Sequence, residues 1–177
     1  MIIHKFIKKC EEFVLCGGHG DADGIFTDGY PDNHAIYHII IKGSVKMGRP
    51  FESNYVTLDA NTSNFVNVKD YLYSQRVYTS SSSYRMYGFN AIDIKQDWNG
   101  KLIKESFVGD DKSWLICFDG NPVINGVNIN PMDYSKLNNK YYDVCLNNAV
   151  VGIFTKLWLL SPILLFCKSG QKLWDFL

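Results

Sequence analysis

Short apolar runs separated by turn residues fill most of this chain. In residues 35–47, AIYHIIIKGSVKM, a β-branched run precedes Gly43 and an alternating run follows it, which is the pattern of two strands joined by a turn. Similar runs follow without a sustained 3.6-residue period: NYVTLD, NFVNV, RVYTSS, YRMYGFNAI, SWLICFDG, PVING, VNINPMDYSKL, KYYDVCLNN and AVVGIFTK. Strands at this spacing predict an all-β sandwich or barrel in which helix is minor.

The first 33 residues are less regular. Residues 1–16 suit either a short helix or a pairing strand, and we favour a strand at residues 13–16. Residues 17–33, GGHGDADGIFTDGYPDN, are dense in Gly, Asp and Pro, which predicts a long loop with tight turns. Long loops inside compact domains often carry function. If this loop covers the mouth of a barrel, Asp32 and His34 would contact a ligand there.

The apolar runs also repeat along the chain. IIIKGSVKM matches ICFDGNPVIN, since each is an apolar run, a glycine (Gly43, Gly120) and a further strand. Three later pairs of segments match at intervals that agree within about two residues: Asp70-Tyr71 with Asp133-Tyr134, Val77-Tyr78 with Tyr141-Tyr142, and Gly88-Phe89 with Gly152-Ile153-Phe154. The stretch between the glycine and the Asp-Tyr pair is longer in the first half, which implies an insertion there. We interpret the pattern as an imperfect repeat of a four-strand unit.

This order of strands resembles the cupin superfamily. The stretches that carry the resemblance are YHIIIKGSVKM and WLICFDGNPVINGVNINPMDYSKLNNKYYDVCLNNAVVGIF, within residues 35–155. The resemblance implies a cupin-like double-stranded β-helix, or jelly-roll barrel, of two imperfectly repeated halves. Because its motif is structural and degenerate, the resemblance supports a fold more than an activity.

Metal-binding cupins carry two histidines one residue apart, then a glutamate ahead of the turn glycine, and a third histidine in the second half. Counted back from Gly43, the corresponding positions hold Tyr30, Asp32 and Ile36, and no histidine follows His38. On a strand, His34 and His38 would share a face but stand roughly 13 Å apart, too far to share one ion without a bulge. We therefore predict no metal site and no cofactor, and a divalent metal is not supported.

Other familiar motifs are incomplete. The acidic segment DADGIFTDGYPD lacks the regular oxygen ligands, terminal glutamate and flanking helices of a calcium loop. The run TSSSSYR, residues 79–85, has no nucleophile elbow and is interpreted as a polar turn. Tyrosines recur through the first half beside Arg76 and Arg85, and such rings line sugar or nucleotide pockets, form interfaces, or pair across strands to stabilise a sheet.

Charge and composition narrow the classes of partner. The chain has 18 basic and 18 acidic side chains and no long run of either sign, so a nucleic-acid partner is not expected. Five cysteines without a CxxC pair suit reduced thiols in a cytosolic core. The N-terminus shows no export signal, and the AT-rich residue bias fits a low-GC bacterium or its phage. We expect a cytoplasmic location, or a virion-associated one if the origin is phage.

The end of the chain differs from the rest. LWLLSPILLFC, in residues 157–167, is too short to span a membrane and contains Pro162. We predict a β domain over residues 1–156 and an apolar C-terminal arm over residues 157–177. The arm is expected to pack on a sheet or on a neighbouring subunit. Self-association is therefore expected, and membrane attachment is not. The predicted anchors are Trp158, Leu160, Ile163, Phe166 and Trp174.

Two functions fit these observations. The first is a non-catalytic cupin-like protein, either a binder of a small polar ligand or a structural or accessory protein, acting as an oligomer. Its predicted ligand-binding residues are Asp32, His34, His38, Tyr84 and Arg85. The alternative is a cupin-type isomerase, epimerase or oxygenase that acts on a small polar substrate. In that enzyme His34 or His38 serves as base or ligand, and Tyr78 or Tyr84 serves as acid.

Overall fold

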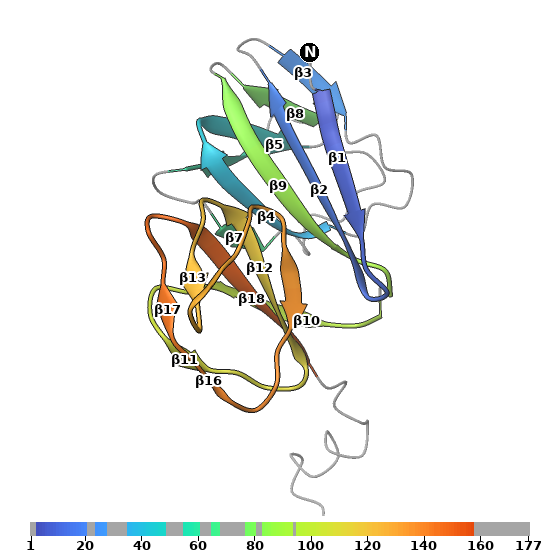
Figure 1. Ribbon diagram of the computed structural model, residues 1–177. Coiled ribbons are helices and arrows are strands. Elements are labelled where there is room, and N and C mark those ends of the chain that lie inside the picture. The colour runs from blue at the N-terminus through green and yellow to red at the C-terminus, as the bar shows by residue number, and fades with distance from the viewer. Residues whose placement is uncertain are drawn as a thin grey trace, which may run out of the picture.

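A computed structural model of the chain describes residues 3–20, 24–27, 35–48, 55–60, 65–67, 77–80, 83–93 and 95–157 (Figure 1). These residues form eighteen strands and no helix, which confirms the all-β prediction. Nothing in these ranges has the helical length and apolarity that a membrane crossing requires.

The strands fall into an N-terminal and a C-terminal half, the upper and lower parts of Figure 1. The N-terminal half contains β1 (Ile3–Lys9), β2 (Phe13–Gly20), β3 (Gly24–Thr27), β4 (Ala35–Lys42), β5 (Ser44–Gly48), β6 (Tyr55–Asp59), β7 (Phe65–Asn67), β8 (Val77–Ser80) and β9 (Tyr84–Ala91). The C-terminal half contains β10 (Trp98–Leu102), β11 (Phe107–Val108), β12 (Ser113–Asp119), β13 (Val123–Ile124), β14 (Val127–Asn128), β15 (Tyr134–Lys136), β16 (Tyr141–Tyr142), β17 (Val144–Cys145) and β18 (Val150–Lys156).

The same strand order occurs in both halves. The order β2-β9-β4-β7 corresponds to β10-β18-β12-β15, and β3-β8-β5-β6 corresponds to β11-β16 together with β17-β13-β14. Strands β16 and β17 together take the place of β8, and β1 adds an outer strand to the first sheet. Each half therefore has the two sheets of a jelly roll. The predicted two-part repeat is confirmed, and its unit is larger than the four strands that the sequence indicated.

The turn that marks each repeat is built the same way. Gly43 follows β4 with φ of 74°, and Gly120 follows β12 with φ of 77°, a left-handed conformation that favours glycine. Both β4 and β12 contain a β-bulge shortly before this turn. Because the glycine and the bulge recur together, residues of the two halves can be matched one by one.

Counting back five residues from each turn glycine gives His38 in β4 and Leu115 in β12. His38 pairs with Gly88 of β9, and Leu115 pairs with Ile153 of β18. Gly88 therefore corresponds to Ile153 and not to Gly152, one residue away from the match that the glycines suggest in the sequence.

Two parts of the sequence form strands that the pattern did not predict. Residues 17–20 continue β2 and residues 24–27 form β3, although the region reads as one long loop. Strand β2 pairs with β1 on one side and β9 on the other, and this two-sided hydrogen bonding outweighs the low strand propensity of glycine. Strands β10 and β11 were missed because their outward positions are polar and β11 has two residues.

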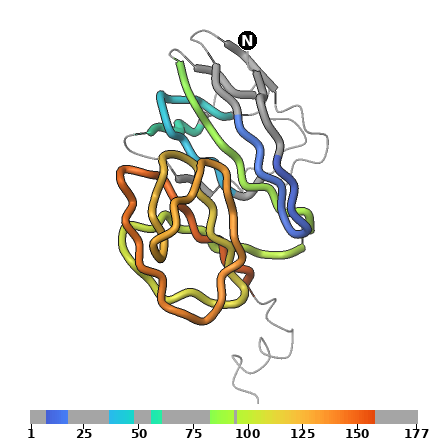
Figure 2. Tube along the Cα trace, in the orientation of Figure 1, coloured from blue at the N-terminus to red at the C-terminus, as the bar shows by residue number. Residues whose placement is uncertain are grey.

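The described residues form three apolar clusters. Each half has a core between its own two sheets, and a third cluster lies between β2-β9-β4 and β10-β18-β12, where it joins the halves. The backbone tube in Figure 2 shows the two halves one above the other. The N-terminal core contains Ile40, Val45, Met47, Leu58 and Tyr84. The C-terminal core contains Ile103, Leu115, Cys117, Ile124, Leu137, Tyr142, Val151 and Ile153. The joining cluster contains Phe13, Leu15, Tyr37, Ile39, Phe89, Ala91, Trp98, Ile116, Phe118 and Phe154.

Aromatic rings dominate the joining cluster. Phe89 of β9 stacks on Phe154 of β18 with ring centroids 4.1 Å apart. The Tyr37 hydroxyl accepts a hydrogen bond of 2.8 Å from the Gly100 backbone amide, so the two halves are also joined by polar contacts. Burial of this much aromatic surface holds the halves against one another.

Candidate ligand pocket at the junction of the halves

Of the residues predicted to bind or catalyse, the structure describes the side chains of His38, Tyr84 and Arg85. His38 and Tyr84 both face the N-terminal core, and each is 3% exposed. Tyr78 belongs to β8, but its side chain is outside the described residues, as are Asp32 and His34. The predicted anchors of the C-terminal arm lie outside the described residues too.

His38 and Tyr84 share a face without meeting. His38 lies opposite Gly88, and Gly88 stands four residues from Tyr84 along β9, roughly 13 Å at strand spacing. Burial raises the pKa of Tyr84 to about 12, so its hydroxyl stays protonated at neutral pH. The structure does not bring these two side chains into a proton-transfer pair.

Arg85 points the opposite way from Tyr84, since successive strand residues face opposite sides of a sheet. Its guanidinium pairs with Asp119 of β12 at 2.8 Å, so it bridges the two halves. Both side chains are about a third exposed or more, and such a pair adds little stability.

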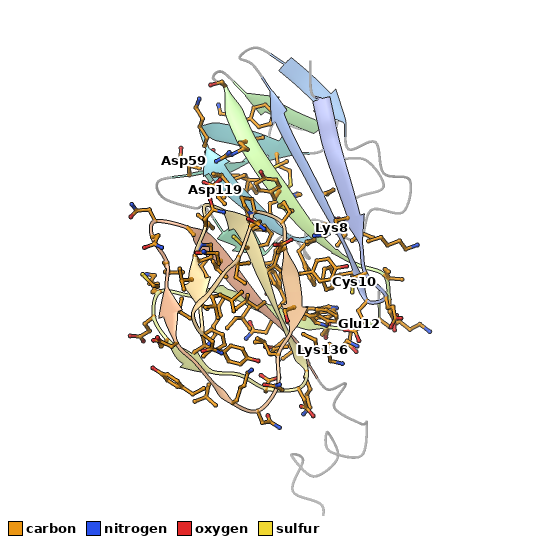
Figure 3. All side chains as sticks on the ribbon, in the orientation of Figure 1. Lys8, Cys10, Glu12, Asp59, Asp119 and Lys136 are labelled. Carbon is orange, nitrogen blue, oxygen red and sulfur yellow. The ribbon has the colours of Figure 1, made fainter. Side chains whose placement is uncertain are left out.

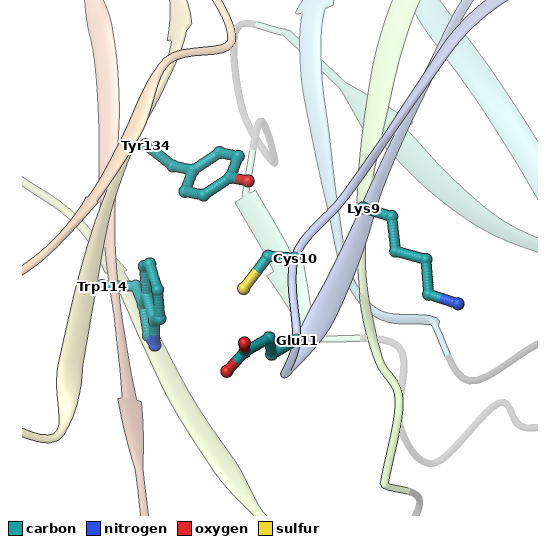
Figure 4. Close-up of a pocket in the computed structure, with 5 residues that line it drawn as sticks. All are labelled: Lys9, Cys10, Glu11, Trp114 and Tyr134. Carbon is teal, nitrogen blue, oxygen red and sulfur yellow. The ribbon is translucent and has the colours of Figure 1, made fainter.

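A pocket of about 530 Å³ lies where the β1–β2 turn meets the C-terminal half (Figure 4). One wall comes from the turn, with Cys10 and Glu11, and the other comes from the rings of Trp114 on β12 and Tyr134 on β15. Figure 4 shows Cys10 and Glu11 directed toward these rings, whereas Lys9 at the rim points away. Its volume lies within the range of small-ligand sites.

The turn is anchored by Glu12, whose carboxylate accepts a hydrogen bond of 2.7 Å from Trp114 Nε1 and pairs with Lys156 at 2.6 Å. Burial raises the pKa of Glu12, but the hydrogen bonds from Lys156 and Trp114 outweigh burial and leave the pKa below its ordinary value. The Trp114 ring is therefore fixed by a charge-assisted bond. A second, smaller hollow of about 170 Å³ lies beside Glu12, with Trp98 and Lys156 in its lining.

Two lysines add positive charge around the aromatic wall. Lys8 Nζ lies 5.0 Å from the centre of the Tyr134 ring, and Lys136 Nζ lies 6.0 Å from the Trp114 ring. Figure 3 shows Lys136 near Cys10 and Glu12, with Lys8 higher along β1. Lys8 also donates to the Met132 carbonyl at 2.9 Å, which holds β1 against the loop before β15.

The pocket combines two aromatic side chains with a carboxylate and a thiol. Ring faces contact the flat apolar side of a ligand, and carboxylate oxygens accept hydrogen bonds from its hydroxyl or amino groups. Sequence reasoning missed this site because its walls come from residues 9–11 and from two strands more than 100 positions later. The available signal was the short polar turn CEE, residues 10–12, between two apolar runs. No pattern in the sequence indicated which strands would lie against this turn.

Comparisons with known proteins support the fold. No family model matches the chain, and no curated protein matches it in sequence. Among solved structures, HutD from Pseudomonas fluorescens SBW25 is similar with a TM-score of 0.53 and 11% identity, over 82% of this chain and 80% of that one. YhhW from Escherichia coli has a TM-score of 0.49 and 11% identity over 82% and 80% of the two chains. A cupin 2 conserved barrel domain protein from Leptotrichia buccalis has a TM-score of 0.43 and 10% identity over 89% of each.

Of these three structures, HutD exceeds a TM-score of 0.5, and at 11% identity the likeness concerns the fold alone. The two sheets of each half have the strand order of a jelly roll, the architecture of cupins. The chain therefore has a cupin-like fold, with two jelly rolls in sequence.

Proposed function

We propose that the protein binds a small, ring-shaped polar ligand in the pocket between the β1–β2 turn and the C-terminal half, without catalysing a reaction there. The observation that carries the proposal is the placement of Trp114 and Tyr134 opposite Glu11 across a pocket of about 530 Å³. A sugar or nucleoside fits this chemistry, because it offers a flat face for the rings and hydroxyls for the carboxylate.

Binding is favoured over catalysis because His38 and Tyr84, the two described side chains among the four expected to move a proton, stand apart and face the N-terminal core instead of this pocket. The rings are already held in place by Glu12 and Lys8, so a ligand would find them preorganised. Self-association through the C-terminal arm remains a prediction, which light scattering on the full chain tests.

The test is a thermal-shift screen with monosaccharides, nucleosides and aromatic acids, followed by calorimetry on the compounds that raise the melting temperature. Tyr134→Ser should weaken binding about tenfold or more, since it removes one ring face. Glu11→Gln should weaken it several-fold, because an amide replaces the charged acceptor.

Tyr141→Ser is the matched control. Tyr141 is a tyrosine of the same half, is 61% exposed on β16 and does not line the pocket. Its removal should leave the affinity unchanged. Equal affinity in wild type and Tyr134→Ser, or a panel in which no compound binds, would show that the pocket is not the ligand site.

A further inference from the structure

Three chemically active side chains meet inside the N-terminal half, away from the proposed ligand pocket. Cys16 of β2 and His38 of β4 both pair with the same residue of the strand between them, Gly88 of β9. Asn90 follows two residues later on β9 and so projects from the same face. This face is the one that carries Ile40 and Tyr84 into the N-terminal core.

The absence of a side chain at Gly88 lets Cys16 and His38 both lie close to the backbone of β9. A methyl group at Gly88 would lie 3.0 Å from Cys16 Sγ and 3.6 Å from His38 Nδ1, so sulfur and imidazole both border the position of the missing side chain. The backbone of Gly88 does not require glycine, because its φ is not in the left-handed region. The glycine therefore permits the close approach of its neighbours, and a thiol and a potential base both border this one residue.

Asn90 fixes the sulfur. Its amide Nδ2 donates to Cys16 Sγ at 3.1 Å and to the Val14 carbonyl at 3.1 Å, which holds the amide in one orientation. An N–H donor aimed at sulfur stabilises a thiolate relative to a thiol. The Cys16 thiol itself donates to the Gly88 carbonyl at 3.8 Å, and the His38 imidazole borders the same glycine. A thiol, an imidazole and an amide that orients the sulfur are the parts from which an activated nucleophile is built.

The surroundings limit what can reach this thiol. Val14 and Ile40 are 9% and 1% exposed, and Met86 packs against the same core, so the neighbourhood is apolar. Cys16 itself is half-buried, whereas His38 is 3% exposed. Small uncharged molecules enter such surroundings at far lower cost than ions do.

We propose that Cys16 is a nucleophilic thiol, with His38 as its base and Asn90 as a positioning residue, that adds to small uncharged ligands carrying an activated carbon–carbon double bond. The sulfur bonds to the β carbon while the π bond opens toward the activating carbonyl. The thiol proton passes to the His38 ring and then to the α carbon. The product is a thioether, all atoms are retained, and no oxidant or second reactant is needed.

Two other cysteines provide internal references. Cys145 is exposed, and its thiol donates to Asn147 Oδ1 at 3.1 Å, so it is accessible without an N–H donor on the sulfur. Cys117 is fully buried in the C-terminal core, and burial raises the pKa of its thiol to about 11. Exposure alone would make Cys145 react before Cys16, whereas activation reverses that order.

The experiment treats the full chain at pH 6.5 with N-ethylmaleimide, an uncharged activated alkene, and follows each cysteine by peptide mass spectrometry. At this pH an ordinary thiol is mostly protonated. Cys16 should react at least about tenfold faster than Cys145. A maleimide that carries a sulfonate should lose this preference, because a charged reagent is excluded from the apolar surroundings.

Two variants test the roles of the neighbours. His38→Gln should slow labelling of Cys16 about a hundredfold and move its pH profile to higher pH, since the base is lost. Gly88→Ala should slow it about tenfold by placing a methyl group between sulfur and imidazole. Cys117→Ser is the control and should leave the rate at Cys16 unchanged.

The proposal is overturned if Cys16 reacts no faster than Cys145 in the wild type, or if folded His38→Gln keeps the wild-type rate and pH profile. Circular dichroism establishes that each variant is folded. If His38→Gln does not fold, the wild-type ratio of Cys16 to Cys145 and the Gly88→Ala rate decide the matter. Loss of ligand binding at Tyr134 has no bearing on this outcome, because the two sites lie on different faces of the N-terminal sheet.

Discussion

Five residues before the turn glycine, the N-terminal half has His38 and the C-terminal half has Leu115. Opposite them stand Gly88 and Ile153. The strand order and register around these four residues are the same, yet one pair is a histidine facing a glycine and the other is two aliphatic side chains. The fold therefore tolerates either interior, and the difference between the halves is a matter of side chains rather than of backbone.

The core of the C-terminal half shows which side chains are sufficient to stabilise one repeat. Its core consists of aliphatic and aromatic residues with Cys117, whose thiol lies 3.6 Å from the carbonyl oxygens of Asp119 and Gly120. The corresponding interior position of the N-terminal half holds His38, which is 3% exposed and borders Gly88 together with the Cys16 thiol and the Asn90 amide. A buried ionisable side chain beside a thiol is a candidate for a functional role.

Exchanging the two interior residues should give the largest effect. Leu115→His places an imidazole in an apolar core and should lower the free energy of unfolding by about 3 kcal/mol. His38→Leu removes a polar group from a half that tolerates leucine at the equivalent site, and should change it by less than about 1 kcal/mol. Urea unfolding of both variants measures the difference. Equal losses would mean that the two interiors are equally dependent on their native residue.

The turn glycines should give a graded effect that is as large at Gly43 and smaller at Gly120. A Cβ at Gly43 would overlap the backbone oxygen of Ser83, and one at Gly120 would lie 2.8 Å from Ala149 Cα, both at positive φ. Alanine should cost about 3 kcal/mol at Gly43 and about 2 kcal/mol at Gly120.

Gly126 is the control for backbone strain. Its φ is 76°, and nothing lies within 4 Å of an added Cβ, so alanine there should cost about 1 kcal/mol from the positive φ alone. Thermal unfolding ranks the three variants. If alanine at Gly126 lowers stability as much as alanine at Gly43, backbone strain from the positive φ explains why the turns need glycine, and the close approach of neighbouring atoms does not.

The contact of Glu12 with Trp114 and Lys156, which joins the two halves, should give the smallest effect on the free energy of unfolding. The pKa of Glu12 is lowered in the folded protein, so its charge stabilises the fold above the ordinary pKa of 4.5 and this contribution is lost as the pH falls through the lower, folded value. Glu12→Gln should cost about 1 kcal/mol or less at pH 7 and should reduce the loss of stability that the wild type shows below pH 4.5. Urea midpoints from pH 7 to pH 3 measure this. If the stability of the variant falls below pH 4.5 as steeply as that of the wild type, the lowered pKa of Glu12 does not contribute to the acid sensitivity of the fold.

The sequence predicted the repeat because its markers are local. Gly43 and Gly120 each stand between apolar runs, and a left-handed turn needs glycine wherever it occurs. The end of β2, residues 17–20, and strand β3 were hidden because their strand character comes from pairing with β1, β9 and β8, and not from residues such as Gly17 and Gly18. The strand propensity of individual residues does not show which distant segments of the chain pair with one another.

The sites were harder to predict than the fold. Cys16, His38 and Asn90 come from three strands and meet through Gly88, which looks in the sequence like the partner of Gly152. One signal was present: His38 interrupts an otherwise apolar strand at an inward position. That signal identified His38, but not the thiol beside it, because spacing along the chain does not show which strands become neighbours.

The central claim is that one half keeps a reactive interior and the other does not. The direct measurement is the labelling of Cys16 and Cys117 by N-ethylmaleimide in the native protein, with both rates compared with the rate of global unfolding. Cys16 should react much faster than the protein unfolds, and Cys117 should react only as fast as the protein unfolds. Labelling of both cysteines at the unfolding rate would show that the two interiors are chemically alike and would contradict a reactive interior in the N-terminal half.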